Sequence, residues 1–302
     1  MPNLQSDNFG SRDPAYGMDP GVYPSVSSRD LGAVKCPASL EAMQETEITL
    51  VPVCPRAGQI LADVSRLTHI GPYALLPKQP QWLHDYYLDT ADQALRAQRF
   101  ALRLRQVEQQ WWLTLKGAPK VTDYGALERL EIEYLWSADG PARICEALAQ
   151  RNVILRVGGP SIKECDALTA LAALGLVQIQ VHDNNRELRD VVTCEGKQRL
   201  IAELALDRVR YRFGHTDLHH YELELESKAR DGSNVLRPMS QLLLTRYGPD
   251  LRIWCHSKLA TGLALCALLN EHAVNAMRDH VGDVCPSVYD LVDRYLGRSD
   301  VS

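Results

Sequence analysis

The sequence predicts an α+β fold in which short strands predominate and helices are interspersed. Two observations support this prediction. After residue 44 many short segments alternate polar and apolar residues with period two, and longer segments with helical periodicity lie between and after them. The predicted strands are residues 45–53, 84–89, 100–107, 111–116, 128–135, 177–181 with 186–194, 200–209 and 221–228. The predicted helices are residues 57–68, 140–151, 166–174, 238–247 and 258–280, the last continuing into a tail helix that ends near Leu296.

The composition is that of a globular protein, with 45% hydrophobic and 24% charged residues. The formal net charge of −5 is opposite to the basic excess of nucleic-acid-binding proteins, so we expect no nucleic-acid partner. The start lacks a signal-peptide pattern, and no apolar run reaches the ~20 residues of a membrane span. We therefore expect a cytoplasmic protein without a membrane partner. The eight cysteines form no CxxC pair, which favours reduced thiols over a zinc site.

The first 40 residues mix Asp, Ser, Pro and Gly with few apolar residues in any pattern. Such a segment cannot bury enough apolar area to offset the entropy lost on ordering. The sequence therefore predicts a disordered N-terminal tail over residues 1–40.

Several of the predicted strands have an unusual polarity, because like charges recur two residues apart on one face. Arg103 and Arg105 share a face, as do Glu131 and Glu133, and the segment YELELE at 221–226 places three glutamates on one face. A sheet with one solvated face is the alternative explanation. We favour a binding surface, because neighbouring like charges repel and require a partner of opposite charge.

A surface rich in both signs suits a polyphosphate with a divalent metal ion. Arg and Lys bind phosphate oxygens, and Mg²⁺ or Mn²⁺ takes carboxylate oxygens and neutralises charge during phosphoryl transfer. For Lys116 the alternative is a solvated lysine at the end of a strand. For Arg186 the alternative is a position in a charge-rich turn. The candidate basic residues are Arg103, Arg105, Lys116, Arg186 and Lys258, and the candidate acidic residues are Glu45, Glu47, Glu131, Glu133, Asp207, Glu222, Glu224 and Glu226.

These motifs resemble the CYTH domain, the triphosphate tunnel metalloenzyme superfamily, which includes bacterial inorganic triphosphatases, thiamine triphosphatases and class IV adenylyl cyclases. The most specific stretch is YYLDTADQALRAQRFALRLRQVEQQWWLTLKG at 86–117, which resembles the family's DT-x-D-x-x-L turn, R-x-R strand and T-x-K-G strand in order. LEIE at 130–133, IAELALDRV at 201–209, YELELE at 221–226 and HSKLATGL at 256–263 follow in the family's order.

The resemblance implies an eight-stranded antiparallel β-barrel, open at both ends, with helices packed outside and the charged faces lining a tunnel. It implies a tunnel domain over residues 41–265 and a C-terminal helical extension over 266–302. It also implies roles for the candidate residues: Arg103, Arg105, Lys116, Arg186 and Lys258 bind the triphosphate, Glu45, Glu47, Glu222, Glu224 and Glu226 hold Mg²⁺ or Mn²⁺, and Glu131, Glu133 and Asp207 form the catalytic acidic lining.

Two positions depart from the family pattern. The family opens with Glu-x-Glu-x-Lys, whereas this chain has Thr49 in place of the lysine. The family's basic residue just before Arg186 is replaced by Asn184. The first departure bears on the rate of hydrolysis more than on binding, because five basic positions remain.

The function that the resemblance implies is metal-dependent hydrolysis of inorganic triphosphate or a similar small triphosphate. A cyclase would need a base-recognition surface, which the sequence does not reveal. A module that binds triphosphate or polyphosphate with little turnover is an alternative, as is hydrolysis of an organic triphosphate such as thiamine triphosphate. The sequence leaves open whether the protein forms a homodimer.

Overall fold

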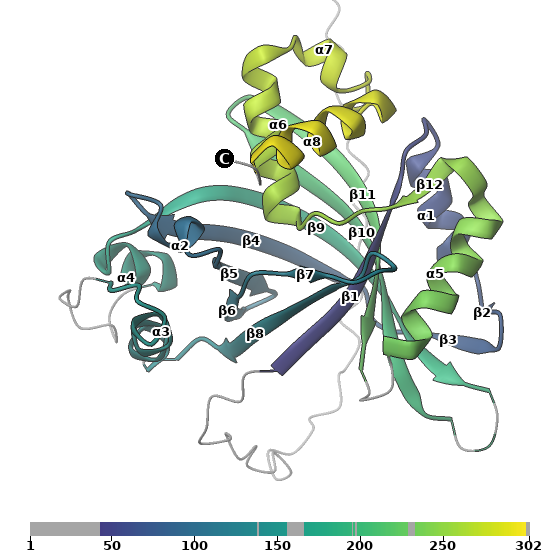
Figure 1. Ribbon diagram of the computed structural model, residues 1–302, viewed down its shortest axis with the longest axis horizontal. Helices are drawn as coiled ribbons and strands as arrows, with labels where there is room; N and C mark the ends of the chain where they lie inside the picture. The colour runs from purple at the N-terminus through teal and green to yellow at the C-terminus, as the bar shows by residue number, and fades with distance from the viewer. Residues whose placement is uncertain are drawn as a thin grey trace, which may run out of the picture. The chain divides into compact units, whose positions relative to one another are not determined.

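The computed structural model describes residues 43–137, 139–155, 166–194, 196, 198–228 and 233–299. The tail predicted over residues 1–40 lies outside this part of the chain. Within these ranges, eight long strands form the framework (Figure 1). They are β1 (Met43–Pro52), β4 (Gln81–Thr90), β5 (Ala101–Val107), β6 (Gln110–Lys116), β8 (Leu127–Leu135), β9 (Leu176–Thr193), β10 (Leu200–Phe213) and β11 (Thr216–Ser227).

These strands form a closed antiparallel ring. Neighbouring strands pair in the order β10-β11-β1-β8-β6-β5-β4-β9, and β9 pairs back onto β10. In the described part of the chain, four shorter strands are added to this ring. β3 (Tyr73–Pro77) pairs with β9, β2 (His69–Ile70) pairs with β3, β7 (Lys120–Val121) pairs with β8, and β12 (Leu251–Ile253) pairs with β1. The eight-stranded antiparallel barrel that the resemblance implies is therefore confirmed.

Because the ring is closed, each strand has one face toward the lumen and one face outward. Helices cover the leucines of the outward faces. On one side, α1 (Ala57–Ser65) and α5 (Ser233–Tyr247) cover outward residues of β1, β10 and β11, including Ile48, Leu204 and Leu223. On the other side, α3 (Gly140–Ala149) and α4 (Ala167–Ala173) share a core with Leu104 of β5 and Ile132 of β8. The short helix α2 (Ala94–Ala97) joins this second core, and the 3₁₀ turn Gly248–Asp250 precedes β12.

The third group of helices covers one end of the ring. Helix α6 (Lys258–Glu271), the short α7 (Val274–Met277) and α8 (Pro286–Ser299) lie together beyond β9, β10 and β11 (Figure 1). Val209 and Tyr211 of β10 alternate with outward residues and therefore face the lumen, yet they are fully buried against side chains of α6 and α8. The helices thus cover this end, whereas the resemblance implies a barrel open at both ends.

The C-terminal helices differ from the predicted single long helix. Helix α6 ends at Glu271, and α8 begins only at Pro286. Gly282 lies between them with a φ of +96°, a backbone conformation that a helix does not tolerate. Proline suits the first turn of a helix because its missing N–H needs no partner there. Among the described residues, no helix is both long and apolar enough to span a membrane.

The segments 177–181 and 186–194, predicted with a break between them, are one continuous strand. On one side β9 pairs first with β4, over 176–186, and then with β3, over 189–193; on the other side it pairs with β10, over 182–192. His182 and Asn184 are fully buried in it, while Asp183 forms an ion pair with Arg212. The hydrogen bonds to strands on both sides hold the sequence HDNN, residues 182–185, in an extended conformation, although Asp and Asn favour turns.

Candidate functional site

Charged side chains of both signs line the lumen. Directly opposed residues of neighbouring strands point to the same side of a sheet, and the strand register opposes Asp207 to Arg186 and to Glu222, and Lys116 to Glu131. All thirteen residues predicted for the site lie on the lumen side of the ring or, for Lys258, at the start of α6. The structure divides them into several groups of ion pairs.

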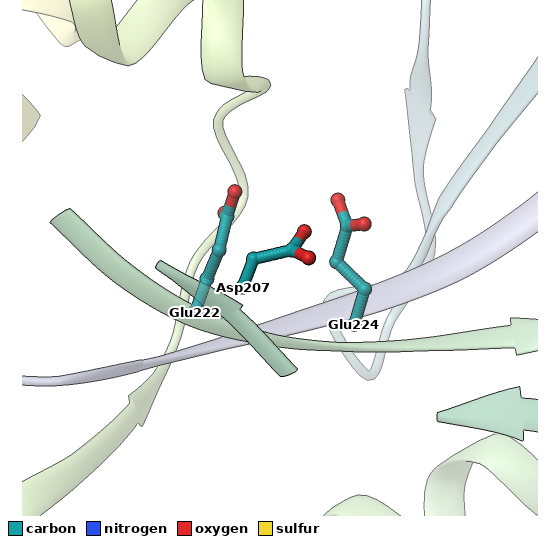
Figure 2. Close-up of side chains that lie close together, drawn as sticks. All are labelled: Asp207, Glu222 and Glu224. Carbon is teal, nitrogen blue, oxygen red and sulfur yellow. The ribbon is translucent and has the colours of Figure 1, made fainter. Parts of the chain in front are cut away.

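The first group is an acidic cluster on β10 and β11, formed by Asp207, Glu222 and Glu224 (Figure 2). One carboxylate oxygen from each lies within 4.8 Å of the others. The Lys258 ammonium lies 2.9 Å from Asp207, 2.5 Å from Glu222 and 2.6 Å from Glu224. Arg186 donates to both oxygens of Asp207, at 2.7 and 2.5 Å, and to Glu224 at 2.5 Å.

The position of Lys258 is set by the start of α6. The Ser257 hydroxyl accepts a hydrogen bond from the Ala260 N–H at 3.2 Å and caps the helix, so that Lys258 is its first residue. The Tyr211 hydroxyl in turn donates to the Lys258 carbonyl at 2.9 Å. Docking of α6 on the covered end therefore delivers the ammonium group into the acidic cluster.

Arg186 and Lys258 favour the ionised form of two carboxyl groups in this cluster. Burial acts to raise the pKa of Asp207, but Arg186 and Lys258 outweigh it and hold this pKa below its ordinary value. Burial is likewise outweighed at Glu224, whose pKa lies well below the ordinary range because of Lys258 and Arg186. Both carboxylates are therefore ionised at neutral pH.

A second group joins β1, β6 and β8. Arg129 donates to Glu45 at 2.7 Å and to Glu47 at 2.6 Å, and Lys116 lies 2.9 Å from Glu45 and 3.1 Å from Glu131. Burial raises the pKa of Glu47 to about 8, against the opposing effect of the Arg129 guanidinium. Sequence reasoning missed Arg129, although its alternation with Glu131 and Glu133 places it on the same face.

A third group lies on β4, β5, β6 and β8. Arg105 donates two hydrogen bonds of 2.7 Å to Asp85, and Arg103 lies 3.3 Å from Glu133. Asp85 is fully buried, and burial acts to raise its pKa, but Arg105 outweighs this and holds the pKa well below its ordinary value. Asp85 was also missed, because a single acidic residue in a strand of tyrosines gives no repeated charge pattern.

The side chains become more exposed toward the end of the ring away from α6 and α8. Along β11 the exposed fraction of the side chain rises from 1% at Glu222 to 15% at Glu224 and 30% at Glu226. Glu226 pairs with Lys228 at 2.7 Å and lies apart from the acidic cluster. The lumen is thus accessible from this end, which we call the mouth.

Both positions that depart from the family pattern face the lumen. Thr49 is 2% exposed and lies directly opposite Glu224. Asn184 is fully buried between the strand neighbours Leu83 and Val209, and neither atom of its amide has a hydrogen-bond partner among the residues that the structure describes.

The acidic cluster suits a hard divalent cation. Three carboxylates supply the oxygen donors that Mg²⁺ and Mn²⁺ prefer, and they already converge on one cation, the Lys258 ammonium. A metal ion in the same place would require this ammonium to move. A separate pocket of about 440 Å³ between α6 and the outer ends of β9 and β10 contains none of the predicted site residues.

The sequence matches the model of a known protein family. A family model of the CYTH domain matches residues 73–244, which is more than half of the chain. No curated protein matches the sequence.

Solved structures match over most of their length, at low identity. HpAC1 from Hippeastrum, described as an adenylyl cyclase candidate with a dominant triphosphatase activity, is 20% identical with a TM-score of 0.47, covering 72% of this chain and 95% of that one. An adenylate cyclase candidate from Bacillus halodurans is 19% identical with a TM-score of 0.40, covering 72% and 96%. PH1819 from Pyrococcus horikoshii is 16% identical with a TM-score of 0.42, covering 76% and 99%.

Proposed function

We propose that this chain, which belongs to the CYTH domain family, binds a small triphosphate in its tunnel and hydrolyses it with the help of a divalent metal ion. The observation that carries the proposal is the convergence of cations and carboxylates on one lumen. Arg186 and Lys258 lie within 2.9 Å of the same acidic cluster, and Arg103, Arg105 and Lys116 project from β5 and β6 nearby.

In this proposal the five basic residues bind the phosphate chain. Arg103, Arg105 and Arg186 offer planar, multidentate donors to phosphate oxygens, and Lys116 and Lys258 offer ammonium groups. Val209 and Tyr211, packed against α6 and α8, close the far end of the lumen. The triphosphate would enter from the mouth, where the side chains are most exposed, with one end reaching toward Lys258.

The residues proposed to hold the metal are Asp207, Glu222 and Glu224, with Glu45, Glu47 and Glu226 as further carboxylates toward the mouth. Mg²⁺ or Mn²⁺ would supply positive charge that offsets the charge developing on the phosphoryl oxygens.

Of the proposed catalytic carboxylates, Glu131 is best placed to accept a proton from water. It is partly exposed and forms an ion pair with Lys116 at 3.1 Å. Asp207 forms ion pairs with Arg186 and Lys258, so we propose that it orients these two cations in addition to holding the metal. Glu133 accepts a hydrogen bond from Thr114 at 2.7 Å and helps to orient Arg103.

A phosphate-release assay tests the proposal. Inorganic triphosphate, longer polyphosphate, ATP and thiamine triphosphate are each compared with Mg²⁺ and with Mn²⁺. We expect release from inorganic triphosphate, abolished by Glu131→Gln and by Glu222→Gln. Glu128→Gln is the matched control, because Glu128 lies on the same strand as Glu131 but alternates to the opposite face.

A second candidate function is triphosphate binding with little turnover, and Thr49 favours it. The family lysine at this position is absent, which removes one cation from the lumen. Calorimetric binding without phosphate release with any divalent metal would establish this second function and exclude the hydrolase.

A further inference from the structure

A buried polar chain connects helix α8 to the acidic cluster. The Tyr289 hydroxyl lies 3.0 Å from His220 Nδ1, and His220 Nε2 lies 3.4 Å from a carboxylate oxygen of Glu222. The other oxygen of Glu222 lies 2.5 Å from the Lys258 ammonium. Tyr289, His220 and Glu222 are all buried.

The chemistry of these groups determines which atom donates each hydrogen bond between Tyr289, His220 and Glu222. Burial raises the pKa of the Tyr289 phenol, which therefore keeps its proton and can donate it to His220 Nδ1. A neutral imidazole that accepts at Nδ1 carries its proton on Nε2. That N–H then faces a carboxylate oxygen of Glu222, which can accept a hydrogen bond from it. The opposite tautomer would set the Nε2 lone pair against that oxygen.

The contact between His220 and Glu222 is slightly longer than a good hydrogen bond. Nε2 has no hydrogen-bond partner within the described ranges of the chain, and a buried N–H without a partner costs free energy. A small rotation of the Glu222 carboxylate toward Nε2 removes this cost. His220 therefore biases the carboxylate toward one orientation.

We propose that Tyr289 and His220 are positioning residues that orient Glu222, so that the C-terminal helix α8 forms part of the site. This inference rests on the proposed role of Glu222 as a metal-holding carboxylate. Hydrogen bonds behind a ligand fix its orientation, and their loss commonly lowers metal affinity by roughly 10–100-fold.

Packing alone is the competing explanation. The Tyr289 ring lies 5.6 Å from the His220 ring and 5.5 Å from the Trp254 ring, and a phenylalanine would keep both contacts. Tyr289→Phe therefore separates the hydrogen bond from the packing.

Tyr221→Phe is the matched control. Tyr221 lies between His220 and Glu222 in the sequence but on the outer face of β11, where its hydroxyl donates to Asp283 at 3.0 Å. Each variant loses one hydroxyl from a largely buried tyrosine, and only Tyr289 leads to the acidic cluster.

The measurement is Mn²⁺ affinity of the full chain by calorimetry without substrate, with thermal unfolding in parallel. We expect Tyr289→Phe to weaken Mn²⁺ binding by about tenfold or more, with Tyr221→Phe unchanged. Equal affinities in the two variants would refute the positioning role and leave the proposed function standing. Wild-type protein that binds no Mn²⁺, either alone or together with a non-hydrolysable triphosphate analogue, would overturn the proposed function itself.

A second pair of variants decides the matter if Tyr289→Phe unfolds. His220→Gln keeps an N–H donor toward Glu222, whereas His220→Leu removes it. We expect the glutamine variant to retain most of the Mn²⁺ affinity and the leucine variant to lose it. Equal affinities in these two would contradict the inference.

Discussion

Replacing Lys258 by methionine would remove the ammonium group from between three carboxylates. The side chain is buried, and its Nζ lies within 2.9 Å of Asp207, Glu222 and Glu224. Methionine keeps the unbranched stem, so the change is one of charge more than of volume. Arg186 would remain in contact with Asp207 and Glu224.

Removing one partner of a buried ion pair typically destabilises a protein by about 3–5 kcal/mol. One kcal/mol shifts the Tm of a domain of this size by about 2–4 °C, so we expect Lys258→Met to lower the Tm by about 6–20 °C in metal-free buffer. Mn²⁺ would offset much of this loss, because it can take the position of the ammonium. A ligand at 100 times its Kd stabilises the folded state by about 2.7 kcal/mol.

The assay is thermal unfolding with and without Mn²⁺. We expect the ion to raise the Tm of Lys258→Met by more than it raises that of the wild type. Lys228→Met is the control, because Lys228 pairs with Glu226 at the mouth and is partly exposed, so that its loss should change little. If Mn²⁺ stabilises Lys258→Met no more than it stabilises the wild type, the ammonium does not occupy the cation position.

Three further predictions concern single positions. Thr49→Lys places a cation on the lumen face opposite Glu224, and we expect phosphate release to rise on the order of tenfold; an unchanged rate would make Thr49 irrelevant to the chemistry. Asp85 has a pKa lowered by Arg105, so its contribution to stability is present above the unfolded pKa of about 4 and is lost as pH falls through the lower folded value. Chemical unfolding at pH 2–6 should show this loss, with a shallower acid slope in Asp85→Asn. Gly262→Ala places a methyl group too close to the buried Gln180 side chain, and we expect a loss of about 1–3 kcal/mol in unfolding free energy, measured by denaturant titration.

The strands and their polarity were predictable because alternation is local. In a closed ring every strand has one face to the helices and one to the lumen, and Arg103, Glu131 and Glu222 show this in the sequence itself. The same rule would have found Arg129. The partner of each cation depends on the register between strands. A pattern within one strand does not contain this information.

The covered end was not predictable in the same way. It forms because α6 and α8 both pack on the end of the lumen. The segment that separates these two helices is not apparent from helical periodicity. His220 and Tyr289 are 69 residues apart, and each looks like an ordinary core residue in its own segment. The strand β2 was missed because two residues show no alternation, and β3 was missed because its sequence YALLP is apolar throughout.

The charge pairing within the lumen predicts that metal and triphosphate bind with mutual dependence. A triphosphate that draws Arg186 and Lys258 onto its oxygens leaves Asp207 and Glu222 buried without a counter-ion, which is unfavourable. A divalent cation that enters with it restores the balance. Each ligand must then raise the affinity of the other by the same factor. We therefore expect a non-hydrolysable triphosphate analogue to bind at least about tenfold more tightly with Mn²⁺, a coupling of about 1.4 kcal/mol. Glu222→Gln should reduce this coupling, because the cluster then carries one charge less. Calorimetry with and without Mn²⁺ measures it, after correction for binding of the ion to the free analogue, and equal affinities would show that the lumen cations bind phosphate without releasing the carboxylates.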